Sequence, residues 1–180
     1  MTGSRVTSKA LDDRAGVAAV LHCLELLKDA ALSWDVAAAF AVQEELGCRG
    51  SAAAAYALQP DRAIAVDVSF ALTPDANPAK CGKLGGGPMV GYAPGLDYAM
   101  CRRLEDVAKQ AGIPCQQEVM GGDTGTDADS ISAARAGVPT ALLSIPLRYM
   151  HTPVEMVDLR DVENVGKLMA EYIKKEGAAK

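Results

Sequence analysis

Residues Ala41–Gly50, with the sequence AVQEELGCRG, join an apolar run to an alanine-rich segment. The apolar run, Val36 to Val42, predicts a buried strand, and the segment Ser51 to Leu58 predicts a helix. Glu44 and Glu45 therefore fall at the C-terminal end of a strand, where an open α/β sheet has its binding crevice. Acids in that position are candidates for chemistry, although a pair of glutamates is also typical of a solvated turn between a strand and a helix.

Three more acids stand at the ends of predicted elements. Asp12 and Asp13 come just before a helix that the spacing of apolar residues predicts as far as Lys28. Asp67 ends a second apolar strand, predicted over residues 62–68. Each position also has a structural interpretation, because acids cap helix N-termini and form turns after strands.

The chain has two histidines, and they lie in different surroundings. His151 stands just past the strand predicted over residues 137–146, which we expect to be the last strand. A single histidine near a tyrosine is also typical of a hydrogen-bonded structural residue. His22 falls off the apolar stripe of the first helix, so we expect it to be exposed.

The remaining chain alternates between short strands and helices. The patterns predict strands over residues 89–92 and 115–120, helices over residues 96–111 and 130–136, and a terminal helix over residues 159–174. Thr126 or Asp127 can cap the helix over 130–136. The glycine run 85–87 lacks the Gly-Lys-Ser/Thr ending of a phosphate-binding loop and indicates a tight turn. This order predicts one α/β domain over residues 1–180 with a mostly parallel sheet.

Composition excludes several classes of function. With 49% hydrophobic residues, 23% charged residues and a net charge of −5, the chain has the profile of a soluble globular protein. It has no basic run and no aromatic platform for nucleic acid, and no apolar stretch long enough to span a membrane. Five scattered cysteines without CxxC spacing indicate free thiols in a reducing cytoplasm.

Taken together, the acids and His151 predict a metal site. An alternating topology brings strand ends to one edge of the sheet, so we expect Asp12, Glu44, Glu45, Asp67 and His151 to meet there. Two like charges about 4 Å apart repel by about 4 kcal/mol at an effective dielectric constant of about 20, and a bound metal reverses that sign. Oxygen and imidazole ligands suit zinc, cobalt or manganese in a catalytic site. An acid beside the metal can act as general base toward metal-bound water.

Five motifs in order resemble a known family. KALDDRAG, QEELGCRG, AVDVSFALTPD, GGDTGTDA and IPLRYMHTPVE, which extend over nearly the whole chain, are similar to signatures of the tetrahedral aminopeptidases. This is the glutamyl aminopeptidase or cellulase-M family of dinuclear metallopeptidases. The resemblance implies a three-layer α/β/α fold of the zinc-peptidase type and the removal of N-terminal residues from peptides.

The resemblance also implies roles for single residues. Asp12 would bridge two divalent metal ions, zinc or cobalt with manganese as a further choice. Glu45 and His151 would complete one metal site, and Asp67 would belong to the other. Glu44 would be the general base, and Asp13 would follow Asp12 through a cis peptide. Thr126, Asp127 and Arg148 match motifs near the substrate pocket, where each is equally well explained by a structural role.

Family members carry further segments upstream of the Asp-Asp motif. One contains the histidine that completes the second metal site, and another is a small β domain for assembly. This chain starts a few residues before Asp12, so we expect a truncated catalytic domain without the β domain, an incomplete second site, and exposed sheet edges. A homo-oligomer or a complementing chain is then an expected partner.

Two other functions are compatible with the same residues. The chain can be an inactive or accessory fragment that binds metal or a partner chain without turnover. Glycoside hydrolysis by paired carboxylates is disfavoured, because Glu44 and Glu45 are adjacent on one strand and do not flank a sugar bond from opposite sides.

Overall fold

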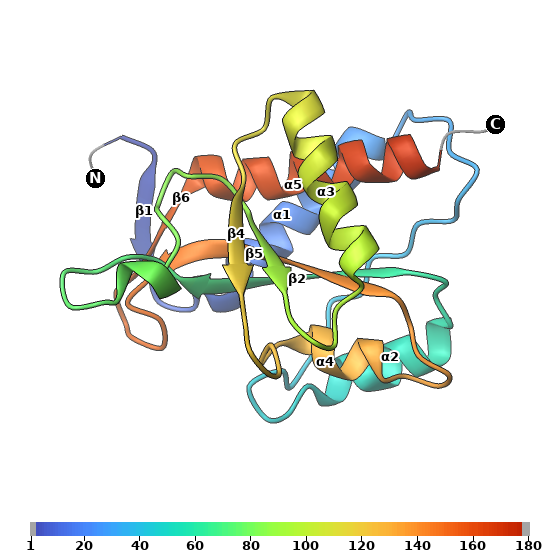
Figure 1. Cartoon of the computed structure of the whole chain (residues 1–180), viewed down its shortest axis with the longest axis horizontal. Coiled ribbons are helices and arrows are strands. Elements are labelled where there is room, and N and C mark those ends of the chain that lie inside the picture. The colour runs from blue at the N-terminus through green and yellow to red at the C-terminus, as the bar shows by residue number, and fades with distance from the viewer. Residues whose placement is uncertain (1–2, 178–180) are drawn as a thin grey trace.

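A six-stranded sheet between two layers of helices forms the described part of the chain, residues 3–177 of a computed structural model (Figure 1). The strands are β1 (Arg5–Ser8), β2 (Ala63–Phe70), β3 (Met89–Tyr92), β4 (Gln116–Val119), β5 (Thr140–Arg148) and β6 (Glu155–Asp158). The helices are α1 (Leu11–Leu27), α2 (Arg49–Leu58), α3 (Tyr98–Ala111), α4 (Asp127–Ser132) and α5 (Leu159–Glu176), with a short 3₁₀ turn at Pro78–Lys80. Helices α1, α3 and α5 cover one face of the sheet, and α2 and α4 lie on the other. The α/β class and its three layers are confirmed.

The sheet is mixed rather than mostly parallel. Its order is β1-β6-β5-β3-β4, with β2 paired to the other side of β5. The β2/β5 and β3/β4 pairs are parallel, while β1/β6, β3/β5 and β5/β6 are antiparallel. Two of the antiparallel pairs involve β6, a four-residue strand with an acid at each end that carries no apolar run. For that reason the sequence patterns predict no strand after residue 146.

The core is centred on β5, in which the first eight of nine residues are buried. Helix α5 packs against β5 and against α1, and Gly166 lies where α5 and α1 meet. A Cβ atom on Gly166 would lie 2.8 Å from the carbonyl oxygen of Ala19 and 2.8 Å from Cδ2 of His22. His22 therefore packs against α5 with only 30% of its side chain exposed, and the expectation of an exposed His22 is wrong.

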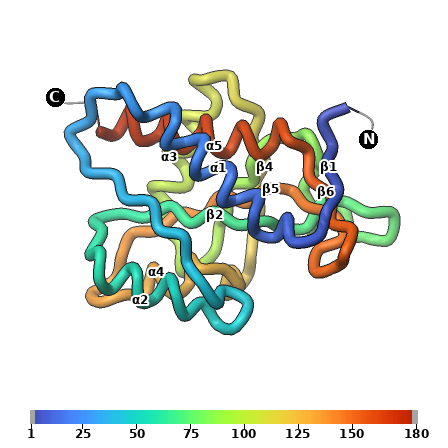
Figure 2. The backbone as a smooth tube through the Cα atoms, turned by 180° about the vertical axis from the view of Figure 1, so that it is seen from behind, coloured from blue at the N-terminus to red at the C-terminus, as the bar shows by residue number. Residues whose placement is uncertain are grey.

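The predicted strand Val36–Val42 is not formed. The run is extended but lies on the surface, with Val36, Phe40 and Val42 exposed by 40%, 50% and 67%. Figure 2 shows it as the long connection from the end of α1 to the start of α2. Its composition suits a strand, yet a strand also needs a neighbour for its backbone groups, and no residue within 3–177 pairs with this run in the sheet.

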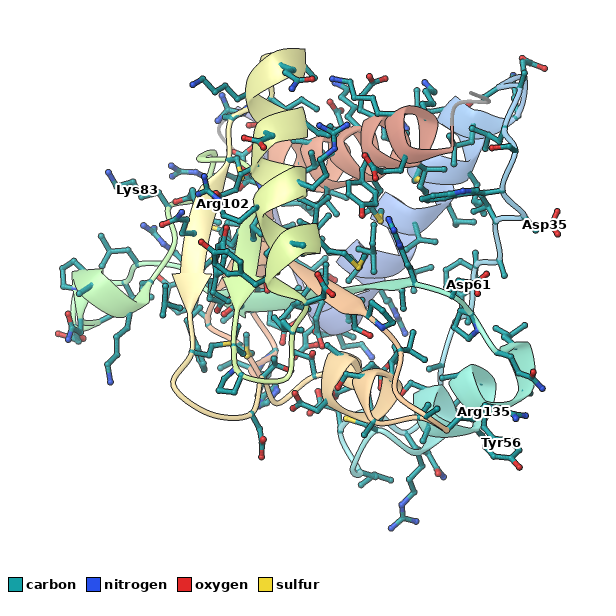
Figure 3. All side chains as sticks on the ribbon, turned by 45° about the vertical axis from the view of Figure 1, so that its right-hand side comes forward. Asp35, Tyr56, Asp61, Lys83, Arg102 and Arg135 are labelled. Carbon is teal, nitrogen blue, oxygen red and sulfur yellow. The ribbon has the colours of Figure 1, made fainter. Side chains whose placement is uncertain are left out.

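The predicted helices agree with the structure apart from shifts at their ends. The largest shift is in α4, which runs from Asp127 to Ser132 instead of over residues 130–136, because the Thr126 side chain accepts a hydrogen bond from Ala128 N and starts the helix there. Across the layer, the Arg135 guanidinium lies 4.0 Å from the ring centre of Tyr56 and its Nε donates to Tyr56 O at 2.6 Å (Figure 3). This contact fixes the end of the α4 region to α2.

No helix among the described residues is both long and apolar enough to cross a membrane.

The glycine run 85–87 is a tight loop held by Asp161. The backbone N–H groups of Gly85 and Gly87 donate to the two carboxylate oxygens of Asp161 at 2.7 and 2.8 Å, and Asp161 is fully buried. Since a protein carboxylate already occupies these N–H groups, the loop is a structural turn and not a phosphate cradle.

Replacing Asp161 by Asn tests this anchor. The amide keeps the size of the side chain but turns an NH₂ group toward one of the two backbone donors, so we expect Asp161→Asn to lower the free energy of unfolding by about 1.5–3 kcal/mol. Urea denaturation should show a lower midpoint at an unchanged slope. Glu163→Gln, an exposed position on the same helix, is the matched control and should leave the midpoint in place. Equal midpoints for Asp161→Asn and the control would contradict the assignment.

Candidate metal centre

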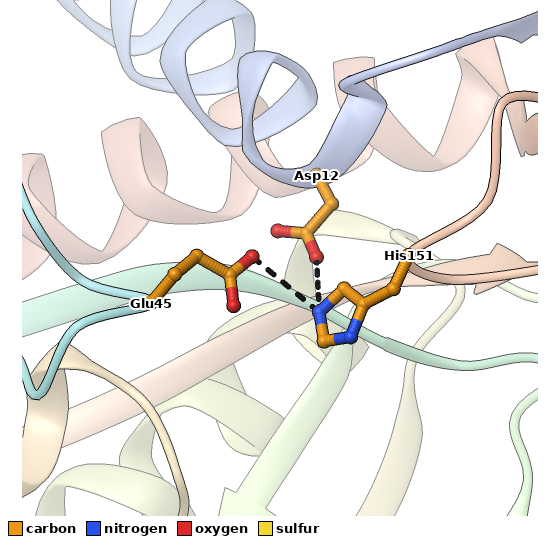
Figure 4. Close-up of side chains that lie close together, drawn as sticks. All are labelled: Asp12, Glu45 and His151. Carbon is orange, nitrogen blue, oxygen red and sulfur yellow. Dashed lines mark ion pairs between the residues drawn. The ribbon is translucent and has the colours of Figure 1, made fainter.

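Three of the four predicted metal ligands meet at one edge of the molecule. Asp12 lies in the first turn of α1, Glu45 in the turn before α2, and His151 in the connection between β5 and β6. One donor atom from each residue lies within 4.8 Å of the other two. His151 Nε2 is 3.1 Å from Asp12 Oδ2 and 3.4 Å from Glu45 Oε1 (Figure 4). Residues far apart in the sequence thus converge as predicted.

The backbone around this group is held in uncommon conformations. The peptide between Asp12 and Asp13 is cis, as the resemblance implies. Ala10, Tyr149 and His151 have φ values of 57°, 61° and 60°, in the left-handed region that side chains with a Cβ rarely adopt. Each such residue costs on the order of 1 kcal/mol, so the surrounding contacts must impose these conformations.

Glu155 is one of those contacts, and the sequence analysis did not single it out. Its side chain is 2% exposed. Oε2 accepts a hydrogen bond from Asp12 N at 3.1 Å, and Oε1 accepts one from His151 N at 2.9 Å. One buried carboxylate therefore ties together the backbones of two predicted ligands. The glutamate four residues after His151 in the motif HTPVE was the available signal, but nothing in the sequence showed that it points inward.

Asp67 lies apart from the three-residue group. It sits within β2, its Oδ1 accepts from Val68 N at 2.8 Å, and it is not among the atoms that converge on His151. Burial raises the pKa of Asp67 to about 7; the Val68 N–H opposes this shift, while the charges of Glu44 and Asp12 add to it. Burial likewise raises the pKa of Asp13 to about 8, with Asp67 as the next contributor. Asp67 and Asp13 thus form a second group of carboxylates beside Asp12.

Glu44 lies near both groups, since its charge acts on Asp67 and Asp13 and the charges of Glu45 and Asp12 act on it. It is half-buried, and its Oε1 accepts a weak hydrogen bond from Cys48 Sγ at 3.7 Å. Burial raises the pKa of Glu44, and the charges of Glu45 and Asp127 raise it further. A carboxylate with a raised pKa is suited to taking and returning a proton near neutral pH.

Of the remaining predicted residues, Thr126 and Asp127 have structural contacts. Thr126 is buried and caps α4, and Asp127 Oδ1 accepts a hydrogen bond from Ser51 Oγ at 2.5 Å, which joins α4 to α2. Arg148 ends β5, and its buried Nε has no hydrogen-bond partner among residues 3–177. Their part in substrate binding stays a prediction.

The residues present fit a divalent cation. Among the described residues, Asp12 and Glu45 form no ion pair with a lysine or arginine, and each pairs with His151. Burial and the charge of Glu45 raise the pKa of Asp12, and the neighbouring His151 partly opposes this shift. Carboxylate and imidazole donors together suit zinc, cobalt or manganese.

An open cleft gives access to this centre. It is lined by Lys9, Ala10, Asp12, Glu45, His151, Thr152, Pro153 and Glu155. All three converging side chains thus border the same solvent-accessible space. An α/β/α sheet with carboxylate and imidazole donors gathered beside an open cleft at one edge is an arrangement typical of metal-dependent hydrolases.

The chain belongs to the M42 glutamyl aminopeptidase family, whose sequence profile matches residues 1–168. It is 39% identical to a lysyl aminopeptidase of Pyrococcus furiosus over 164 residues, covering 91% of this chain and 47% of that protein. Among solved structures, it resembles a TET aminopeptidase from a marine sediment thaumarchaeon, with a TM-score of 0.92, 34% identity, and coverage of 99% of this chain and 51% of that one. It also resembles the Pyrococcus horikoshii TET1 peptidase, with a TM-score of 0.81, 32% identity, and coverage of 96% and 51%. The chain spans about half the length of the curated relatives it matches.

His151 and His22 offer a matched test of the metal centre. Removing the imidazole donor takes away one of three converging ligands, so we expect His151→Gln to weaken binding of Zn²⁺ or Co²⁺ at least tenfold, measured by calorimetry. His22→Gln changes the other histidine, which packs against α5 away from this group, and should bind the ion like the unaltered chain. Equal affinity of His151→Gln and the unaltered chain would contradict a centre at this place.

Proposed function

We propose that this chain provides the catalytic centre of a metal-dependent aminopeptidase, which removes N-terminal residues from peptides. The observation that carries the proposal is the convergence of Asp12, Glu45 and His151 beside Glu44, in a chain of the M42 family. The relatives and structural neighbours described above are named as aminopeptidases or peptidases.

Two divalent cations, zinc, cobalt or manganese, fit the proposed assignment of ligands. Asp12, Glu45 and His151 would hold one ion, and Asp67 with Asp12 would hold the other. When bound, the ions would supply Lewis acidity toward the scissile carbonyl and toward water. The second ion has only Asp12 and Asp67 among the assigned ligands, so the first is the better-held of the two.

Glu44 supplies the proton transfer in this proposal. Its carboxylate takes a proton from the attacking water and returns it to the leaving amine, which requires a pKa raised above that of an exposed glutamate. Glu155 holds the backbones of Asp12 and His151 in place and does not take part in the chemistry. Thr126, Asp127 and Arg148 belong to the surroundings of the substrate.

The chain is proposed to act in the cytoplasm and in an assembly, either with copies of itself or with a complementing chain. Five free cysteines support a reducing compartment. The Pyrococcus horikoshii TET1 peptidase can assemble into a tetrahedron or a large octahedral shell. In this chain, the exposed apolar run 36–42 offers a surface for such contacts.

Glu44→Gln tests the catalytic proposal directly. The amide preserves shape but cannot accept the proton, so we expect kcat/KM on an aminoacyl coumarin amide to fall by about 10²–10⁴-fold in the metal-loaded protein, with metal affinity kept. Glu163→Gln makes the same chemical change on the exposed face of α5 and should leave activity unaltered. Equal activity of Glu44→Gln and the unaltered chain would contradict the role of Glu44. Absence of turnover from metal-loaded protein would favour a binding fragment instead.

A further inference from the structure

Lys9 is a cation in the open cleft of the candidate centre. The cleft has a volume of about 500 Å³, and Lys9 lines it together with Asp12, Glu45 and His151. The Lys9 side chain is exposed and forms no ion pair with a carboxylate in residues 3–177. The other acid of the cleft, Glu155, is 2% exposed and already accepts two backbone N–H groups. Lys9 therefore offers the cleft a positive charge that a ligand can use.

The backbone holds Lys9 next to the candidate centre. Lys9 directly follows β1, and the last residue of β1, Ser8, is the partner of Glu155 in the β1/β6 pair. Glu155 in turn accepts the hydrogen bond from Asp12 N at 3.1 Å. Lys9 and Asp12 are three residues apart, so their Cα atoms are at most about 11 Å from each other. The strand pairing and the hydrogen bond that position Asp12 thus also position the residue that carries the ammonium group.

Opposite charges lie at different places around the candidate centre. Asp13, Glu44 and Asp67 are a group of acids beside Asp12, and none of these three is among the residues that line the cleft. Lys9 is in the cleft itself. A short peptide carries an ammonium group at one end and a carboxylate at the other. It therefore complements this charge distribution in one direction, with its ammonium group toward the acids and its carboxylate toward Lys9.

We propose that Lys9 binds a carboxylate on the leaving part of the substrate; this rests on the proposed aminopeptidase function. The carboxylate is the C-terminal group of a dipeptide or the side chain of an acidic second residue, and both present the same oxygen acceptors to the ammonium group. An extended dipeptide spans about 7 Å, and the flexible four-carbon stem of Lys9 covers the remaining distance from the centre. Substrates with a carboxylate close to the scissile bond are therefore preferred over those without one.

The dipeptide Leu-Ala and its C-terminal amide are matched substrates that differ in the carboxylate alone. We expect the metal-loaded chain to hydrolyse Leu-Ala with a kcat/KM about fivefold higher than that for the amide, as for an ion pair that stays open to solvent. Lys9→Gln should abolish this preference, and Lys9→Arg should retain it. Lys167→Gln, which removes an exposed lysine of α5, is the matched control and should behave like the unaltered chain. Leu-Asp amide compared with Leu-Asn amide tests the acidic side chain in the same way.

Binding supplies a second readout that does not depend on turnover. In the reduced analogue of Leu-Ala, a CH₂–NH group replaces the peptide bond, so the compound is not hydrolysed. Calorimetry on the metal-loaded chain should give tighter binding for this analogue than for its C-terminal amide. The difference should disappear in Lys9→Gln and shrink in about 0.5 M NaCl, because salt screens an exposed ion pair. A thermal midpoint of Lys9→Gln equal to that of the unaltered chain shows that the variant is folded.

The outcomes separate this role of Lys9 from the proposed function. Hydrolysis of acids and amides at equal rates in both matched pairs, or a preference that survives in Lys9→Gln, would overturn the role of Lys9 and leave the proposed function standing. Discrimination in binding without any turnover would support Lys9 and contradict the catalytic proposal. Failure of every peptide and analogue to react or bind in metal-loaded protein would overturn both.

Discussion

The buried carboxylate of Glu155 fixes the geometry on which the candidate centre depends. It accepts hydrogen bonds from the backbone N–H groups of Asp12 and His151, one at the start of α1 and one in the connection from β5 to β6. Asp12 and Glu155 are 143 positions apart in the sequence, so this hydrogen bond joins the start of α1 to the start of β6. Ala10 and His151, which adjoin these hydrogen bonds, have positive φ angles of 57° and 60°. The backbone fold therefore sets the positions of the donor atoms of Asp12 and His151.

Negative charge is the second constraint on this part of the molecule. Asp12, Asp13, Glu44 and Asp67 all have raised pKa values, and burial is the largest cause at each. A protein that needed only a stable core would gain by replacing such groups with apolar ones. Their retention is explained by a cation or a proton transfer that uses them.

Much of the fold follows from local patterns in the sequence. The periodic apolar residues of α1, α3 and α5 and the apolar runs of β2 and β5 identify those elements and the α/β class. The strands β1 and β6 were missed because four polar or mixed residues carry no period, and they form only by pairing, β1 with β6 and β6 with β5. The prediction of a strand at Val36–Val42 was wrong for the opposite reason. Its apolar composition suits a strand, but no neighbouring strand pairs with it in residues 3–177.

The sequence predicted that Asp12, Glu45 and His151 would meet, and their side chains do converge. The expected reason holds only for His151, which follows β5, because Asp12 lies in the first turn of α1 and the strand expected before Glu45 is not formed. Asp67 lies within β2 outside this three-residue group, and its assignment to the second metal ion stays a prediction. Glu155 was not predicted, because its role depends on a hydrogen bond to Asp12 N, which is distant in the sequence. His22 was predicted to be exposed because the helical pattern of α1 does not show that α5 packs against it at Gly166.

We propose that one divalent cation binds where the side chains of Asp12, Glu45 and His151 meet. A crystal of the chain grown with Zn²⁺, measured at the zinc absorption edge, locates the ion directly. We expect an anomalous peak about 2.0–2.2 Å from one oxygen each of Asp12 and Glu45 and from Nε2 of His151. Zinc bound only elsewhere, with these three side chains turned away from one another, would contradict the account.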